Sequence, residues 1–149
     1  MGRPTGIRAR LNKRTILEGG SDATVDPPGW DTRINVLYPN TLARGHLLAQ
    51  DLGGSGDKYT NIVALCQRTA NLQMKSIEQR VKKQVNALDG CYVDYEVEPL
   101  YHGSDKIPYA IRIRATSVDL TSPYCWIEES AWNNPIPNET NPYKCKGAT

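Results

Sequence analysis

Arg44-Gly45-His46 and the glycine-rich stretch Leu52-Gly53-Gly54-Ser55-Gly56 that follows it decide how this chain is interpreted. Further along come an asparagine, Asn71, and a glutamate, Glu78, in a stretch with helical periodicity. Histidine ionises near pH 6.5, so it is largely neutral at physiological pH and can take a proton from water. Amide and carboxylate oxygens are ligands that a hard divalent cation such as magnesium prefers. The segment therefore holds the donors for a site that combines one base with one metal ion.

The clearest predicted helix runs from about residue 69 to about residue 88. Thr69 is a suitable N-cap, and Asp89-Gly90 places a glycine where helices commonly end. At about 100° per residue, one stripe of this helix is apolar and carries Met74, Ile77, Val81 and Leu88, with Val85 at its edge. A neighbouring stripe carries Asn71, Lys75, Glu78 and Lys82. Taken alone, that stripe is explained by an ordinary solvated helix face with a Glu78–Lys82 ion pair. The Arg-Gly-His segment is what favours a metal site there.

Several segments have the period-2 alternation or composition of strands. Residues 34–38 (Ile-Asn-Val-Leu-Tyr) and 62–65 suit strands, and residues 50–60 read as a loop. The stretches 93–98 and 109–116 each alternate apolar and polar residues, which predicts an antiparallel hairpin with one wet face. Glu96 and Glu98 are expected to lie across from Arg112 and Arg114 on that face.

The remaining segments carry weaker signals. Residues 1–30 predict an irregular or short-stranded N-terminal arm, and residues 118–149 an irregular C-terminal cover rich in proline and asparagine. No repeat and no domain boundary is visible, so we expect one α+β domain over residues 1–149.

Composition excludes some classes of protein. A mean hydropathy of −0.54 and the lack of a long apolar run argue against a membrane span. Residues 1–20 hold no apolar segment of signal-peptide length, so we expect no signal peptide in this chain. None of Cys66, Cys91, Cys125 and Cys145 forms a Cys-x-x-Cys pair, which argues against a zinc knuckle. If the thiols are oxidised, Cys125 and Cys145 are the expected bridge; free thiols in a reducing compartment fit equally well.

The net charge is only +2, but the cations are clustered. One group precedes the first acid and comprises Arg3, Arg8, Arg10, Lys13 and Arg14; a second comprises Lys75, Arg80, Lys82 and Lys83. Such patches can bind phosphate while the total charge stays near neutral, and they can equally be ordinary solvated faces.

An ordered series of motifs covers the chain from about residue 27 to about residue 116. It comprises Pro27-Pro28-Gly29-Trp30, Arg44-Gly45-His46-Leu47-Leu48, Leu52–Asp57, Asn61-Ile62-Val63, Ala70-Asn71, Met74…Glu78…Val81, Val93…Tyr101-His102-Gly103 and Ile107-Pro108. With these motifs the chain resembles the DNA/RNA non-specific endonucleases of the ββα-metal (His-Me finger) superfamily. It looks most like the members found as C-terminal toxin domains of bacterial polymorphic toxins.

The resemblance implies a ββα-metal finger as the core, with the long helix of about 69–88 packed on an antiparallel sheet. It implies that His46 is the general base, that Asn71 is a ligand of Mg²⁺ (with Mn²⁺ as a substitute), and that Glu78 binds or orients the ion. The chain departs from the motif pattern of these endonucleases at two positions that bear on the implied roles. Ala43 stands where many relatives have an acid, and the gap from Asn71 to Glu78 is one residue shorter than in many of them.

The residues themselves add the charges that phosphodiester hydrolysis needs. Arg44 is the best candidate for a fixed cation near the scissile phosphate because it belongs to the His46 turn, and Lys75, Arg80 and Lys82 are candidate nucleic-acid contacts. His102 is expected to be a surface loop residue, and Asn61 to make structural hydrogen bonds. The chain has no recognition helix or paired zinc motif, which agrees with low sequence selectivity.

We therefore expect a magnesium-dependent, sequence-non-specific endonuclease of DNA and/or RNA. The resemblance implies a toxin module that is delivered to the cytoplasm of a target cell and held inactive by a cognate immunity protein in the producer. Three alternatives stay open: a secreted nutritional or virulence nuclease without an immunity partner, a non-catalytic nucleic-acid-binding module, and a disulfide-stapled interaction domain.

Overall fold

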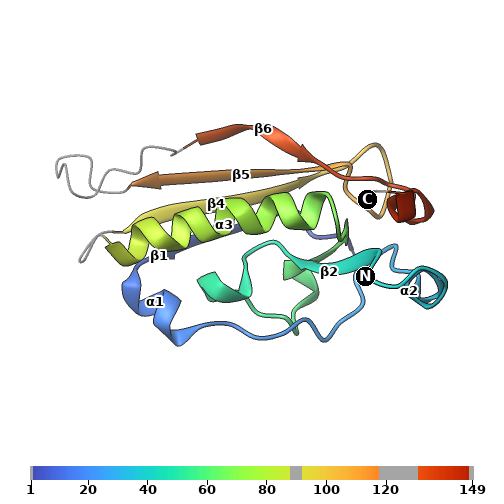
Figure 1. The fold of residues 1–149 in the computed structure, drawn as a ribbon. Helices are drawn as coiled ribbons and strands as arrows, with labels where there is room; N and C mark the ends of the chain where they lie inside the picture. Colours follow the sequence, from blue (N-terminus) through green and yellow to red (C-terminus); the bar gives the residue numbers. More distant parts are fainter. Residues whose placement is uncertain (1, 88–91, 118–130, 148–149) are drawn as a thin grey trace.

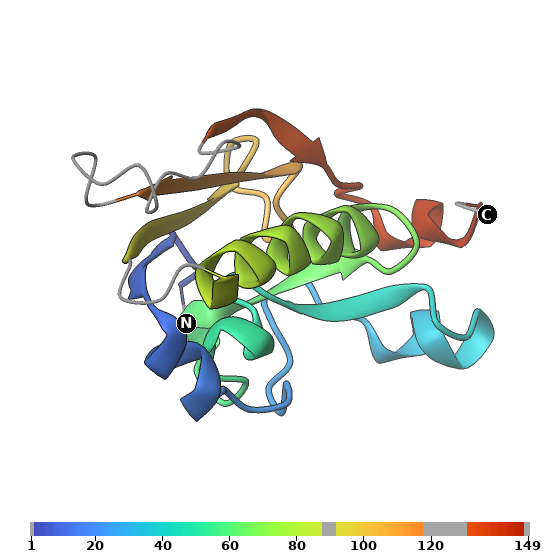
Figure 2. The ribbon, with the colours of Figure 1, turned by 60° about the vertical axis from the view of Figure 1, so that its left-hand side comes forward.

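The computed structural model describes residues 2–87, 92–117 and 131–147. A long helix, α3 (Ala70–Ala87), lies between two antiparallel sheets, as both ribbon views show (Figures 1 and 2). The larger sheet has the order β1 (Ile7–Leu11), β4 (Val93–Leu100), β5 (Ala110–Ser117), β6 (Ala131–Pro137). The smaller one pairs β2 (Leu42–His46) with β3 (Ile62–Cys66). The succession β2–β3–α3 is the expected ββα finger, and the α+β class is confirmed.

The hairpin of β4 and β5 has the register expected from its alternation. Val93, Tyr95 and Val97 are buried, while the acids between them face outward. Glu96 lies opposite Arg114, and Glu98 lies opposite Arg112 at 3.7 Å. The outer face of the sheet is thus a ladder of opposite charges, whereas the inner face forms the core with α3.

The helix α3 begins directly after Thr69, as predicted. Its apolar stripe, comprising Met74, Ile77, Val81 and Val85, is buried in the main core together with residues of both sheets. The predicted Leu88 and Asp89-Gly90 end of the helix lies outside the described residues. Because this stripe is turned into the core, the neighbouring stripe with Asn71 and Glu78 lies at the edge of the finger.

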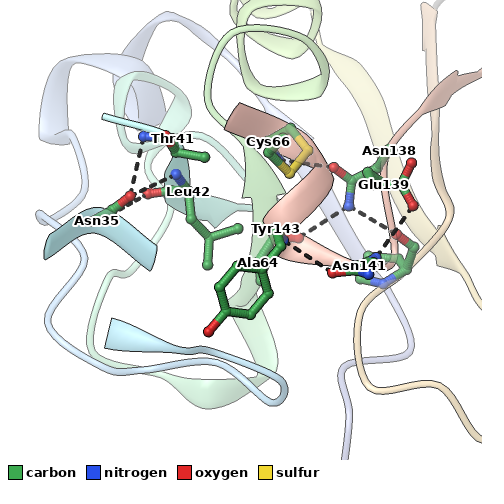
Figure 3. The surroundings of a disulfide bond; sticks show 11 residues. Asn35, Thr41, Leu42, Ala64, Cys66, Asn138, Glu139, Asn141 and Tyr143 are labelled. Carbon is green, nitrogen blue, oxygen red and sulfur yellow. Dashed lines mark hydrogen bonds between the residues drawn. A yellow bond between two sulfur atoms is a disulfide. The ribbon is translucent and has the colours of Figure 1, made fainter. Parts of the chain in front are cut away.

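The strand expected over residues 34–38 is wrong: residues 34–37 belong to a short helix, α2 (Thr32–Leu37), and Tyr38 is its C-cap. Asp31 caps it by accepting a hydrogen bond from the Arg33 N–H. Asn35 turns its amide to the following chain, where Oδ1 accepts from the Thr41 and Leu42 N–H groups (Figure 3). Only Ile34 of this helix is buried, so the capping and these side-chain bonds override the β-propensity of the segment.

The N-terminal arm takes the short-stranded form, one of the two expected, and adds a short helix. Strand β1 joins the edge of the larger sheet beside β4 and is followed by a one-turn helix, α1 (Lys13–Glu18). Asn12 and Thr15 form a reciprocal capping box, in which the Asn12 side chain accepts from Thr15 N–H and Thr15 Oγ1 accepts from Asn12 N–H. The turn is anchored by Ile16, which is buried in the main core.

The irregular cover expected over residues 118–149 is wrong in part, because residues 131–137 form strand β6 against β5. This strand carries Pro135 and Pro137, which signalled irregular chain. It is the outermost strand of the sheet, and an edge strand tolerates prolines because one side makes no ladder bonds. Residues 118–130 lie outside the described part of the chain.

The disulfide also differs from the expected one. Cys145 is bonded to Cys66 at the end of β3, with a Cα–Cα distance of 5.3 Å, and not to Cys125, which lies outside the described residues. Asn138 brings the C-terminal segment to β3, since its side chain bonds Cys66 N, Ala64 O and Pro108 O (Figure 3). The bridge therefore fastens the final 3₁₀ turn (Pro142–Gly147) to the finger.

We expect the double variant Cys66→Ala/Cys145→Ala to lose about 4 kcal/mol in its free energy of unfolding, because this bridge closes a loop with a sequence separation of 79. Urea unfolding of both proteins with and without reductant measures this. Reductant should lower the wild type to the level of the variant and leave the variant unchanged. Equal stability of the two oxidised proteins would show that the bridge adds nothing.

Candidate active site

A cleft of about 580 Å³ opens between strand β2 and the first turns of α3. Strand β2 contributes Arg44 and His46 to its lining, and α3 contributes Asn71, Lys75 and Glu78. The structure thus brings together five of the seven residues that the sequence singled out as catalytic, metal-binding or nucleic-acid-binding. The lining is completed by residues that the sequence did not single out, including Gln67 and Asp51.

His46 is the last residue of β2 and is partly buried. Its Nε2 lies 2.8 Å from the carbonyl oxygen of Ser21. A carbonyl can only accept, so Nε2 carries the hydrogen, and in the neutral ring the lone pair is on Nδ1. This contact fixes the tautomer that a general base needs, and it also stabilises the ring after it has taken a proton.

The Ser21 carbonyl is itself held by the glycine-rich loop. Ser21 N–H donates to Gly54 O at 3.1 Å, and Gly56 N–H donates to Ser21 Oγ at 2.9 Å. Thr24 N–H donates to Gly56 O at 2.8 Å. A Cβ on Gly54 or Gly56 would overlap backbone atoms of Leu48 or Asp22. The glycines are therefore present because two backbone segments pack directly on one another.

Asn61 has the structural role expected of it. The residue is 4% exposed, and its Oδ1 accepts from Leu48 N–H at 2.8 Å. Its Nδ2 donates to Leu48 O at 3.1 Å and to Ser55 O at 2.9 Å. These three bonds fasten the chain after His46 to the glycine-rich loop, so Asn61 supports the site without lining it.

Asn71 lies in the first turn of α3, and its amide orientation is set by Gln67, four residues earlier. Asn71 Nδ2 donates to Gln67 Oε1 at 3.1 Å. The oxygen Oδ1 accepts no hydrogen bond from the part of the chain that the structure describes. It remains available in the cleft as a hard oxygen ligand.

Glu78 is only 7% exposed, yet it lines the same cleft. Burial raises the pKa of its carboxyl to about 7, the nearby Lys75 charge opposes this rise, and Asp51 adds to it. Asp51 is tied to the helix, since it accepts from Gln79 Nε2 at 3.0 Å and pairs with Lys82 Nζ at 3.7 Å. Glu78 is thus a buried acid that forms no ion pair with the residues that the structure describes, and a bound metal ion would favour its ionised form.

Arg44 is held in place at the rim of the cleft. Its Nε and Nη2 lie 2.8 Å and 2.7 Å from Asp26 Oδ1, and its guanidinium carbon lies 4.4 Å from the centre of the Trp30 ring. An arginine fixed by an acid and an aromatic ring presents its remaining N–H groups in a defined direction.

Of the three other predicted nucleic-acid contacts, one lines the cleft and two do not. Lys75 lines the cleft, whereas Lys82 pairs with Asp51 rather than with Glu78. Arg80 does not line the cleft. His102 is exposed in the β4–β5 loop and stacks on Tyr109 at 3.8 Å, as expected for a surface loop residue.

Comparison with known proteins agrees with this arrangement. A model of the DNA/RNA non-specific endonuclease family matches residues 1–119, which is most of the chain. The chain belongs to the DNA/RNA non-specific endonuclease family. Members of this family are metal-dependent nucleases with nucleic acid as substrate. No curated protein sequence is significantly similar to the chain.

Solved nuclease structures share the fold. The Sda1 nuclease with a bound zinc ion has a TM-score of 0.70 at 18% identity, over 94% of this chain and 71% of that one. An extracellular endonuclease has a TM-score of 0.55 at 20% identity, over 79% of this chain and 58% of that one. An extracellular nuclease has a TM-score of 0.54 at 20% identity, over 80% of this chain and 62% of that one. The chain therefore spans less than two thirds of the length of the last two of these structures.

The donor set in the cleft fits a metal ion that is bound by few, hard oxygen ligands. The described residues contain no cluster of three or more His, Cys, Asp or Glu that could surround a metal. They do offer the unbonded Asn71 Oδ1 and the buried Glu78 carboxylate, and both are hard oxygens. Magnesium commonly keeps several waters and takes only one or two protein ligands, so such a sparse set suits it.

No described helix is both long enough and apolar enough to cross a membrane.

We expect Gly56→Ala to lower the rate of nucleic-acid cleavage by about 10²-fold, because the added methyl would overlap the Asp22 backbone, which directly follows the Ser21 carbonyl that contacts His46. Gly2→Ala is the matched control, since a Cβ there meets nothing within 4 Å. The measurement compares initial rates for the three proteins, with circular dichroism to verify the fold. Wild-type activity in a folded Gly56→Ala protein would show that the loop does not position the base.

Proposed function

We propose that this protein is a metal-dependent, sequence-non-specific endonuclease that hydrolyses phosphodiester bonds of DNA, RNA or both. The observation that carries the proposal is the convergence of His46, Asn71 and Glu78 in one cleft, with His46 Nε2 bonded to a carbonyl. Family membership agrees with it.

The chemistry begins with His46. Its Nδ1 takes a proton from a water molecule, and the water oxygen forms a bond to phosphorus while the bond to the leaving oxygen breaks. The Ser21 carbonyl stabilises the positive charge that develops on the ring. Arg44 and Lys75 offer their N–H groups to the phosphate oxygens from two sides of the cleft.

Asn71 and Glu78 would hold the divalent ion, Asn71 by Oδ1 and Glu78 directly or through water. The ion, when bound, would neutralise charge on the non-bridging and leaving oxygens. We propose Mg²⁺ as this ion, with Mn²⁺ as a substitute, because both prefer oxygen ligands. The structure of the Sda1 nuclease holds a zinc ion, so Zn²⁺ is the third ion to test. The test compares cleavage rates after chelator has removed the metal and each ion has been added back.

The experiment that tests the activity uses closed circular substrates, because they have no ends. With magnesium, the wild type should cut supercoiled plasmid, circular single-stranded RNA or both, and sequencing of the products should show cuts without a shared motif. Degradation of linear substrates alone, or cutting at one motif, would contradict a non-specific endonuclease.

The resemblance to polymorphic toxins supports a toxin module with a cognate immunity protein that acts in the target-cell cytoplasm. The Cys66–Cys145 bridge favours the second candidate, a secreted nuclease without such a partner, because disulfides persist mainly in oxidising compartments. The two settings differ in what reduction should do. A toxin must cut nucleic acid with both thiols reduced, whereas loss of cutting in reductant at 37 °C would favour the secreted enzyme.

The buried Glu78 predicts an unusual dependence of stability on pH. Its folded-state pKa of about 7 lies above the ordinary value of 4.5, so the folded protein binds more protons than the unfolded chain between these values. In chelator we therefore expect the free energy of unfolding to fall by about 2 to 3 kcal/mol from pH 5 to pH 8. Urea titrations at both pH values measure the change.

Glu78→Gln supplies the control for this prediction, because the amide does not titrate. The variant should lose most of the pH-dependent fall, and magnesium should restore stability to the wild type at pH 8 more than to the variant. Identical pH profiles for the two proteins would show that Glu78 does not titrate in this range.

A further inference from the structure

A second hollow of about 640 Å³ lies beside the cleft. The two are separated by a single ion pair: Arg44 lines the cleft, and its partner Asp26 lines the hollow. Pro27 and Pro28 form an apolar wall next to Asp26, and Arg3 and Lys106 line the hollow as well. A chain molecule that occupies the cleft could therefore continue into the hollow across Arg44.

Arg3 differs from the other arginines of the N-terminal basic group. Arg8 pairs with Glu96, Arg10 with Asp94, and Arg14 with Glu18, so these cations belong to solvated ion pairs. Arg3 instead donates through Nη1 to the carbonyl oxygens of Gly103 and Asp105, both at 2.8 Å, and its guanidinium carbon lies 4.2 Å from the centre of the Tyr101 ring. Carbonyl groups hold the side chain without cancelling its charge, so Arg3 is a positioned cation.

Lys106 is the second cation of the hollow. It is exposed, and it pairs with no acid among residues 2–87, 92–117 and 131–147. Among the described residues, Asp26 is the one acid that lines the hollow, and Arg44 opposes its charge at 2.7 Å. The side chains that line the hollow therefore carry a net positive charge, and an anion is the complementary occupant.

We propose that the second hollow binds a backbone phosphate of the nucleic-acid strand whose scissile phosphate occupies the cleft. This rests on the proposed function, and it extends the substrate site by one subsite on the far side of Arg44. Arg3 and Lys106 contact the phosphate, and the two prolines contact the adjoining sugar. The contacts are to the backbone alone, so they add affinity without sequence preference. An acidic protein surface is the rival occupant, and continuity with the cleft favours the strand.

The test is the salt dependence of binding, measured by fluorescence anisotropy. The full chain with His46→Ala is titrated with a labelled single-stranded oligonucleotide in magnesium at several salt concentrations. Lys106→Gln in this background should reduce the slope of log K against log salt by about 0.7, and Lys106→Gln with Arg3→Gln by about twice that amount. Arg3→Lys keeps the charge and should retain most of the slope, which separates loss of a phosphate contact from damage to the fold.

Lys13→Gln is the matched control, because this exposed lysine on α1 lines neither the cleft nor the hollow. A slope for Lys106→Gln equal to that of Lys13→Gln would overturn the proposal. Cleavage by the His46-containing chain is measured in parallel. If the His46-containing chain cuts nucleic acid but Lys106→Gln does not change the salt slope of binding, the subsite is refuted and the proposed nuclease function stands. If the His46-containing chain does not cut but Lys106→Gln reduces the salt slope of binding, the catalytic function is refuted and the phosphate subsite stands.

Discussion

Replacing His46 by alanine is expected to reduce the cleavage of DNA and RNA by about 10²- to 10⁴-fold, the range of a lost general base. The variant keeps the cleft, the metal ligands and the basic residues, and it removes only the group that can take a proton from water. The Ser21 carbonyl loses its partner, but the glycine-rich loop still holds it. The measurement is the initial rate of plasmid cutting at saturating magnesium.

His102→Ala is the matched control for this experiment, because it removes the other histidine, which lies outside the cleft and stacks on Tyr109. It should cut at the wild-type rate. Binding of labelled oligonucleotide should be similar in all three proteins, since neither histidine is a phosphate contact here. A His46→Ala protein that cuts within a few-fold of wild type would show that another group activates the water.

Replacing Asn71 by alanine is the second change with a large expected effect. It removes an unbonded amide oxygen from the cleft, and a magnesium ion with few protein ligands depends strongly on each of them. We expect about a 10²-fold fall in the cleavage rate at fixed magnesium, with partial recovery as magnesium is raised. The magnesium dependence of the rate measures this directly.

Two further variants sharpen the test. Asn71→Asp keeps an oxygen in place and should retain metal dependence near the wild-type concentration, whereas Gln73→Ala alters an exposed residue two positions further along α3 and should change nothing. If Asn71→Ala needs no more magnesium than the wild type, the ion is held elsewhere and the ligand assignment is wrong.

The sequence predicted those parts of the fold whose pattern is local. Strict alternation in β4 and β5 set both the register and the pairing of Glu98 with Arg112. The apolar stripe from Met74 to Val85 defined α3 and turned Asn71 and Glu78 to a common side. The Arg-Gly-His motif then located the cleft, since β2 and α3 are adjacent parts of one finger.

Long-range contacts decided the parts that the sequence did not predict. The carbonyl that orients His46 comes from Ser21, 25 residues earlier, and a backbone carbonyl has no sequence signature. Cys145 pairs with Cys66 because Asn138 brings two distant segments together. Helix α2 forms where a strand was expected, and here the sequence does carry a local signal, the capping residue Asp31. The capping pair Asn12 and Thr15 is a similar signal for α1.

The measurement that tests the central claim most directly is cleavage of supercoiled plasmid and total RNA by wild-type protein and His46→Ala, each with magnesium and with EDTA. We expect cutting only by the wild type and only with magnesium. Cutting that survives EDTA, or equal cutting by the two proteins, would contradict the one-base, one-metal site. Failure of the folded wild-type protein to cut either substrate with magnesium or manganese would leave a non-catalytic nucleic-acid-binding module as the better description.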